Sequence, residues 1–133
     1  MKRKLAGNFS ILSFIIFIIA GCNLVSSSTN SPEGVVESYI KALVAKDSNT
    51  LSNLSCADWE QSAIREFDSL QAVKVRLDGL SCGKTGVDGD YSLVNCTGKI
   101  IATYNGEDQN FDLSTRNYKV MNNNGEYLVC GYQ

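Results

Sequence analysis

The sequence predicts an α+β domain: N-terminal helices packed on a four-stranded antiparallel meander sheet. Apolar residues recur at helical spacing from Val36 onward, and the spacing changes to alternation after Gln71. Turn signals then separate the later segments, at Asp88-Gly89, Asn105-Gly106 and the three asparagines before Gly125. Helices followed by a meander indicate that the helices cover one face of the sheet.

A first helix is predicted from about Pro32 to Lys46. Ser31 suits the N-cap, Pro32 suits the first helical position, and Glu33 places a negative charge in the first turn. One apolar face follows at helical spacing: Val36, Ile40, Leu43 and Val44.

Two shorter helices are predicted next. Asp47-Ser48 ends the first helix and caps a second that carries Leu51 and Leu54, and Asp58 is the predicted cap of the third. The third helix has an apolar face and a charged face, so we expect the first to be buried and the second to face solvent. The apolar face is Trp59, Ala63, Phe67 and Leu70, and the charged face is Glu60, Arg65, Glu66 and Asp68.

Four strands follow. Alternation of Val73, Val75 and Leu77 with charged residues predicts a half-buried first strand. The other strands are expected at residues 91–104, at about 107–120 and at 127–132, each bounded by a turn signal.

The N-terminus has the order of an export signal. Three basic residues precede an apolar run of 12 residues, Phe9 to Ala20, whereas a membrane-spanning helix needs roughly 20. The closing Ile19-Ala20-Gly21-Cys22 resembles the lipobox of bacterial lipoproteins. The resemblance implies that Cys22 receives a diacylglyceryl group and becomes the acylated first residue of the mature chain. The alternative is a plain secretory signal with Cys22 as an ordinary thiol.

These features predict three parts: a signal peptide at 1–21, a lipidated cysteine and flexible Ser-rich tether at 22–31, and a domain at 32–133. Removing the signal leaves nine basic residues against 14 acidic ones. Such a chain has no basic stripe for nucleic acid, and anionic lipid heads repel it. We therefore expect the lipid on Cys22 to hold the protein at a cell membrane, on the extracytoplasmic side, with the choice of inner or outer membrane left open.

Four cysteines remain once Cys22 is lipidated. An even number in an oxidising setting predicts two disulfides, whereas zinc would need closer spacing or the histidine that this chain lacks. Hairpin register brings Cys82 within one residue of Cys96, which favours Cys82–Cys96 with Cys56–Cys130. The alternative, Cys56–Cys82 with Cys96–Cys130, needs the last strand to lie beside the second.

The opening SPEGVVESYIKALVAKD, the two helices after it, and long strands ending in GEYLVCGY together resemble the NTF2-like, cystatin-like cone fold. The resemblance covers about residues 32 to 132. It implies a curved sheet wrapped around helices. It does not imply one activity, because such domains serve as isomerases, dehydratases, ligand carriers and interaction modules.

The absence of histidine removes Ser-His-Asp and Cys-His sites and the usual acid–base group at neutral pH. Asp58, Glu60, Asp112 and Tyr104 could line a cone, but no spacing marks them as a catalytic set. We therefore expect no catalytic residue, no cofactor and no metal site.

The leading hypothesis is a non-catalytic binding or interaction domain, tethered to the membrane through Cys22, with a small ligand or an envelope protein as partner. One alternative is a small enzyme of the isomerase or dehydratase type that uses carboxylate and Tyr residues in the cone. The other is a cystatin-like protease inhibitor or a structural envelope protein.

The lipobox makes a direct prediction. The mature protein should begin at Cys22 and carry the mass of its acyl chains, and Cys22→Ser should move it from the membrane fraction to the soluble fraction. Intact mass spectrometry and fractionation measure both outcomes. A mature chain that keeps Met1, or an unmodified Cys22, would contradict the lipoprotein interpretation.

Overall fold

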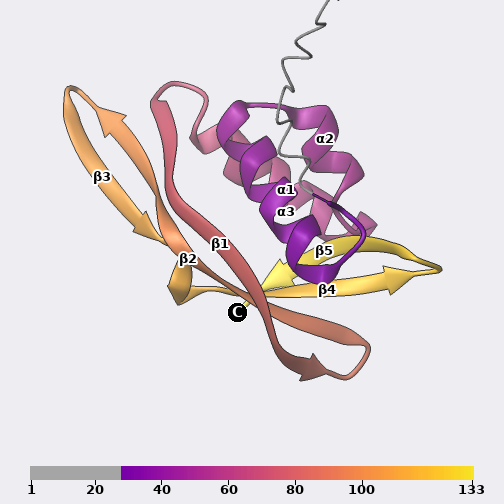
Figure 1. The fold of residues 1–133 in the computed structure, drawn as a ribbon. Helices are drawn as coiled ribbons and strands as arrows, with labels where there is room; N and C mark the ends of the chain where they lie inside the picture. Colours follow the sequence, from indigo (N-terminus) through magenta and orange to yellow (C-terminus); the bar gives the residue numbers. More distant parts are fainter. Residues whose placement is uncertain (1–27) are drawn as a thin grey trace, which may run out of the picture.

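The computed structural model describes residues 28–133, so the predicted signal peptide, Cys22 and most of the tether lie outside the described residues. Three helices come first (Figure 1): α1 (Pro32–Ala45), α2 (Ser48–Asn53) and α3 (Ala57–Ser69). None of the helices in this part of the chain has the length and apolar character needed to span a membrane. The strands are β1 (Lys74–Asp88), β2 (Tyr91–Tyr104), β3 (Glu107–Asp112), β4 (Asn117–Asn123) and β5 (Glu126–Tyr132).

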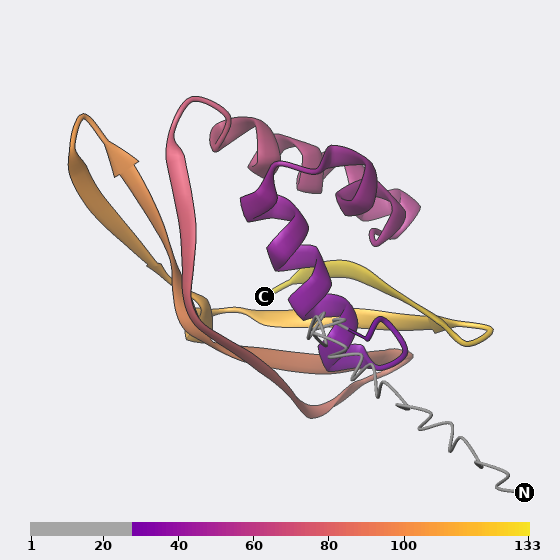
Figure 2. The ribbon, with the colours of Figure 1, turned by 45° about the horizontal axis from the view of Figure 1, so that its top comes forward.

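The described strands form one antiparallel sheet in the order β1-β2-β4-β5, with β3 paired to β2 as well. The helices lie on the concave side of this curved sheet (Figures 1 and 2). The predicted α+β class with helices on one sheet face is therefore confirmed. The prediction of four strands is wrong, because the sheet has five.

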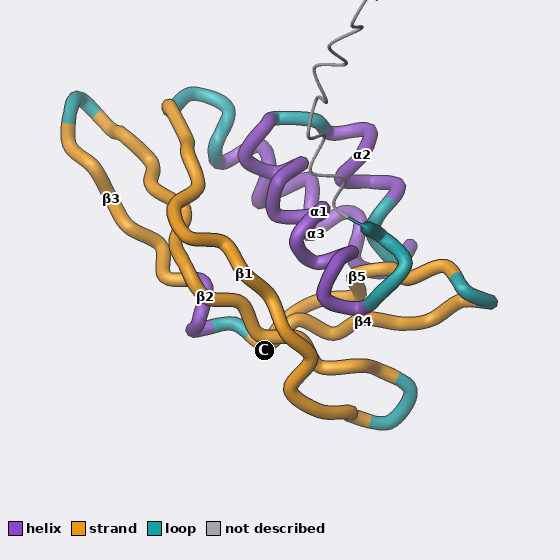
Figure 3. The backbone as a smooth tube through the Cα atoms, in the orientation of Figure 1, coloured by secondary structure: helices purple, strands orange, loops and turns teal. Residues whose placement is uncertain are grey.

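The fifth strand arises from a break in the predicted return strand at 107–120. The 3-10 turn η1 (Leu113–Thr115) separates β3 from β4 (Figure 3). The Asp112 carboxylate accepts a hydrogen bond from the Ser114 backbone N–H at 2.9 Å, and this competes with strand pairing. Leu113 turns into the core, where it is 1% exposed. The cap at Asp112 and the burial of Leu113 therefore both stabilise the break in the strand.

The hairpin turns test the predicted registers. The turn at Asn105 and Gly106 is confirmed, with φ of 50° and 85° and with Tyr104 opposite Glu107. The first hairpin turn is displaced by one residue from the prediction, since Asp88 pairs with Tyr91 and leaves residues 89–90 as the turn.

A register shift between Lys84 and Gly86 then places Cys82 directly opposite Cys96. A disulfide joins these two residues, whose Cα atoms lie 4.0 Å apart. The second disulfide joins Cys56 to Cys130, with Cα atoms 4.9 Å apart. These are the pairs that the strand register favoured, and β4 lies between β2 and β5 as that argument required.

The helix ends agree with the sequence except at α3. Ser31 caps α1 by accepting from the Gly34 N–H, and Asp47 caps α2 by accepting from the Thr50 N–H. Asp58 was predicted to cap α3, but the N-cap is Cys56. Cys56 is held by its disulfide and donates its N–H to the Val129 carbonyl at 2.8 Å, so the helix begins at the point where the chain is fixed to β5.

The core lies between the helices and the concave face of the sheet. Its centre is formed by α1, which buries Tyr39 and Ile40 completely. Leu51 of α2 and Ala63 of α3 are also fully buried. The sheet contributes Val94, Cys96, Ile100, Tyr118, Val120 and Val129.

The sheet bends sharply where the partner of β2 changes from β3 to β4 (Figure 2). Beyond the bend lies a segment that we call the arm: residues 74–78 of β1, residues 99–104 of β2, and β3. Gly98 lies at the bend with φ of 94°, and a Cβ added to it would lie 2.5 Å from the Asp78 carbonyl oxygen. Only glycine permits this close approach of β1 and β2.

Replacing Gly98 by alanine should therefore destabilise the domain. We expect Gly98→Ala to lower the free energy of unfolding by roughly 2–4 kcal/mol, because both the left-handed φ and the backbone clash oppose it. Gly83→Ala is the matched control, since no atom lies within 4 Å of its added Cβ. Urea denaturation measures both, and equal losses would show that the bend does not require Gly98.

Candidate functional site: a cavity between α3 and the arm

A cavity of about 320 Å³ lies between the C-terminal half of α3 and the arm. Its walls combine apolar and polar side chains, and Phe111, one of the apolar ones, is 42% exposed. The α3 side contributes Glu66, Ser69 and Leu70, and the sheet side contributes Ile100, Asn110, Phe111, Asp112, Leu113, Thr115 and Arg116.

An ion pair between Glu66 and Arg116 forms the charged part of the lining. The Arg116 Nη1 lies 2.6 Å from the Glu66 Oε1, and the two side chains are only 27% and 18% exposed. Glu66 was predicted on the solvent face of α3, and that prediction is wrong. Residue 66 is seven positions after Trp59, which is two helical turns, so both lie on the buried face.

The Glu66 Oε2 is buried and has no hydrogen-bond partner in the described part of the chain. A buried acceptor without a donor costs roughly 1–3 kcal/mol. The carboxylate therefore holds Arg116 with one oxygen, while the other is enclosed without a hydrogen-bond donor.

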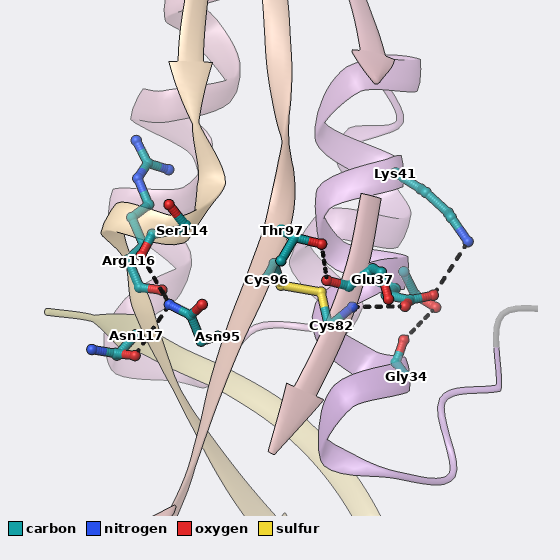
Figure 4. Close-up of a disulfide and its surroundings, with 12 residues drawn as sticks. Gly34, Glu37, Lys41, Cys82, Asn95, Cys96, Thr97, Ser114, Arg116 and Asn117 are labelled. Atoms are coloured by element: carbon teal, nitrogen blue, oxygen red, sulfur yellow. Dashed lines mark hydrogen bonds and ion pairs between the residues drawn. A yellow bond between two sulfur atoms is a disulfide. The ribbon is translucent and has the colours of Figure 1, made fainter. Parts of the chain in front are cut away.

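The side chain of Asn95 fixes the chain at Arg116 (Figure 4). Its amide donates to the Ser114 carbonyl at 3.0 Å, to the Arg116 carbonyl at 2.9 Å and to the Asn117 side-chain oxygen at 3.3 Å. Asn95 belongs to β2, and its neighbour Cys96 is held to β1 by a disulfide. The rigid sheet thus sets the position from which Arg116 reaches α3.

Four aromatic residues pack behind the ion pair, and we call them the aromatic cluster: Tyr39, Trp59, Tyr118 and Tyr132. The Arg116 guanidinium lies over the Tyr132 ring, 4.3 Å from its centre. Tyr132 makes edge-on contacts with Trp59 at 5.3 Å and with Tyr118 at 5.6 Å. The Trp59 indole N–H donates to the Tyr39 hydroxyl at 3.1 Å.

Burial sets the protonation of this cluster. It raises the pKa of Tyr118 to about 12, although the adjacent Arg116 guanidinium acts in the opposite direction. Burial likewise raises the pKa of Tyr39 above its usual range, against the hydrogen bond from Trp59. For Arg116, burial alone would lower the pKa, but the Glu66 carboxylate outweighs it and the net shift is upward. At neutral pH both phenols are protonated and the guanidinium is charged.

The residues named from the sequence as possible cone groups are not brought together. Asp112 lines the cavity, but its carboxylate is engaged by Ser114. Asp58 and Glu60 are exposed in the first turn of α3, and half-buried Tyr104 ends β2. None of these three lines the cavity.

The structure places Arg116 and Phe111 at the cavity, which the sequence did not indicate. The residues next to Arg116 and Phe111 in the sequence form no pattern that would distinguish a cavity residue from a surface residue. The positions of both depend on the break in the strand at η1. Glu66 could have been found from its helical spacing to Trp59. Within residues 28–133, no group of three or more potential metal ligands occurs.

No protein-family model and no curated protein sequence matches the chain. Its fold is similar to the solution structure of a SEC-C motif containing protein from Rhodopseudomonas palustris, with a TM-score of 0.54, 14% identity and 80% of each chain covered. The crystal structure of the helical cell shape determining protein Pgp2 from Campylobacter jejuni gives a TM-score of 0.49 at 12% identity, over 75% of this chain and 38% of that one. At such identities the first likeness concerns the fold alone.

The raised pKa of Tyr118 predicts a loss of stability at alkaline pH. Because its phenol ionises near pH 10 in the unfolded chain and near 12 in the folded domain, its contribution is complete below pH 10. Between those values the free energy of unfolding should fall by roughly 1.4 kcal/mol per pH unit for this one proton.

Tyr118→Phe should remove that part of the slope in urea denaturation between pH 9 and 11. Met121→Leu, a change in β4 that removes no ionisable group, should leave the slope unchanged. An unchanged slope in Tyr118→Phe would mean that burial does not hold this phenol protonated.

Proposed function

We propose that the chain is a membrane-anchored extracytoplasmic lipoprotein whose NTF2-like domain binds a ligand or a partner in the cavity between α3 and the arm, without catalysis. The observation that carries the proposal is the cavity itself, whose lining combines apolar side chains with the Glu66–Arg116 pair. A volume of about 320 Å³ lies at the lower end of the range for small-molecule sites.

The fold supports the NTF2-like part of the proposal. Helices occupy the concave side of a sharply bent antiparallel sheet (Figure 2). The cavity is lined by residues of α3 and of the arm. The two disulfides support an oxidising compartment, which agrees with export.

The electrostatics favour binding over proton transfer. The pKa of Tyr118 and that of Arg116 both move away from neutrality, so neither group exchanges a proton readily near pH 7. The Glu66 charge is compensated by Arg116 at 2.6 Å. Such a site offers fixed charges and dipoles for orienting a bound group.

A small enzyme of the isomerase or dehydratase type is the second candidate, and one observation favours it. Glu66 is a carboxylate in the cavity lining, and its Oε2 has no hydrogen-bond partner among the described residues. Glu66→Gln separates the two functions, because it abolishes proton transfer while an amide can still accept a hydrogen bond from a ligand.

Binding in the cavity can be tested with the apolar anion 1-anilinonaphthalene-8-sulfonate, whose fluorescence rises in apolar sites. The protein should bind it in a 1:1 ratio. Ser69→Trp, at the cavity lining, should weaken binding by about tenfold, or 1.4 kcal/mol.

Gln61→Trp is the matched control, since Gln61 is an exposed residue of the same helix outside the cavity lining. It should bind the dye as the unmodified protein does. Equal dye binding by both variants would remove the cavity as the binding site.

A further inference from the structure

We propose that the end of the hairpin formed by β1 and β2 docks on the lipid surface that the acyl chains of Cys22 enter, so that the arm and its cavity point away from the membrane. We call this end, residues 83–92, the hairpin tip. The inference rests on the proposed lipoprotein and adds which surface of the domain meets the lipid.

The start of the described chain is held against α1. The Ser28 carbonyl passes so close to Gly34 that a Cβ added there would overlap its oxygen, so this path requires glycine. The Asn30 N–H donates to the Ser28 hydroxyl at 3.3 Å, and the Ser31 hydroxyl accepts from the Gly34 N–H at 3.1 Å. The chain therefore leaves the domain at the first turn of α1.

The covalent length of the tether brings that turn close to the lipid. Six residue steps join Cys22 to Ser28, and at roughly 3.4 Å each they span at most about 20 Å. A mature chain anchored through Cys22 therefore keeps Ser28 within that distance of its acyl chains. The surface around the first turn of α1 is the one that can reach the membrane.

The hairpin tip lies on the same side of the domain as the first turn of α1. Glu37, in the second turn, accepts from the Cys82 N–H at 3.1 Å (Figure 4), and β1 continues from there into the tip. At the other end of α1, Lys46 donates to the Val73 carbonyl beside the arm. The 14 residues of α1, about 21 Å, separate the two ends. Figure 2 accordingly shows the hairpin tip and the arm on opposite sides.

The hairpin tip exposes an apolar side chain. Val87 is 63% exposed. It lies opposite Ser92, which lies opposite buried Val120, so Val87 shares the concave face of the sheet with α1. Tyr91 adds an aromatic ring to the tip, with the Lys119 amine 5.9 Å from its centre. Apolar, aromatic and basic side chains together are typical of segments at a membrane interface.

Charge favours the same orientation. The hairpin tip with the adjacent Lys119 is neutral, because Lys84 and Lys119 balance Asp88 and Asp90. The exposed charges of α3 are three acidic and one basic, and the arm carries four acidic and three basic residues. Anionic lipid heads therefore repel α3 and the arm more than they repel the hairpin tip.

Acylation of lysines by the water-soluble reagent sulfosuccinimidyl acetate tests this orientation. Lys84 of the hairpin tip and Lys74 of the arm are both exposed, and about 33 Å of extended β1 separates them. The lipidated protein is added to preformed vesicles of phosphatidylethanolamine and phosphatidylglycerol. Lys84 should then react about fivefold more slowly than in soluble Cys22→Ser protein beside the same vesicles, while Lys74 keeps its rate. Peptide mass spectrometry measures both rates.

Val87→Ser should reduce the slowing at Lys84 to about twofold or less, whereas the matched variant Val87→Leu should retain it. Equal effects of the vesicles on Lys84 and Lys74, or full slowing in Val87→Ser, would overturn docking by the hairpin tip and leave the lipoprotein proposal standing. A mature protein that does not associate with the vesicles would overturn both proposals.

Discussion

The hydrogen bonds from the Asn95 side chain to the segment after β3 are the constraint on which the site depends. One amide group bonds to Ser114, Arg116 and Asn117. These bonds fix the chain between the end of β3 and the start of β4, the two strands that pair with different parts of β2. Without that anchor the return strand could continue straight along β2, and Arg116 would face a different direction. The break in the strand and the ion pair with Glu66 are thus two results of one local arrangement.

The disulfides support that arrangement from both sides. Cys82–Cys96 holds β2 to β1 next to Asn95, while Cys56–Cys130 holds the start of α3 to β5. Glu66 and Arg116 therefore approach each other from two cross-linked frames. A partly buried ion pair is favourable only when its geometry is well held, because each charge loses hydration on burial.

Much of the fold could be predicted because local chemistry determines it. The cap at Ser31, the change of period after Gln71 and the turn at 105–106 each depend on residues close in sequence. The break at Leu113 could not be predicted, since it depends on contacts with Asn95 and with the core. The same holds for the site. The place of Glu66 on the buried face of α3 could be predicted from its helical spacing to Trp59, whereas the position of Arg116 depends on tertiary contacts.

The direction of α1 has a mechanical consequence. Its first turns lie near Cys82 of β1, and its end lies near Val73, so the chain enters the domain at the end opposite the arm. A pull on that entry point would act on residues 31–55, a segment of about 85 Å when extended at roughly 3.4 Å per residue, before it reached the cross-link at Cys56. At Cys56 the load would pass through the disulfide to β5 as well as along the chain into α3.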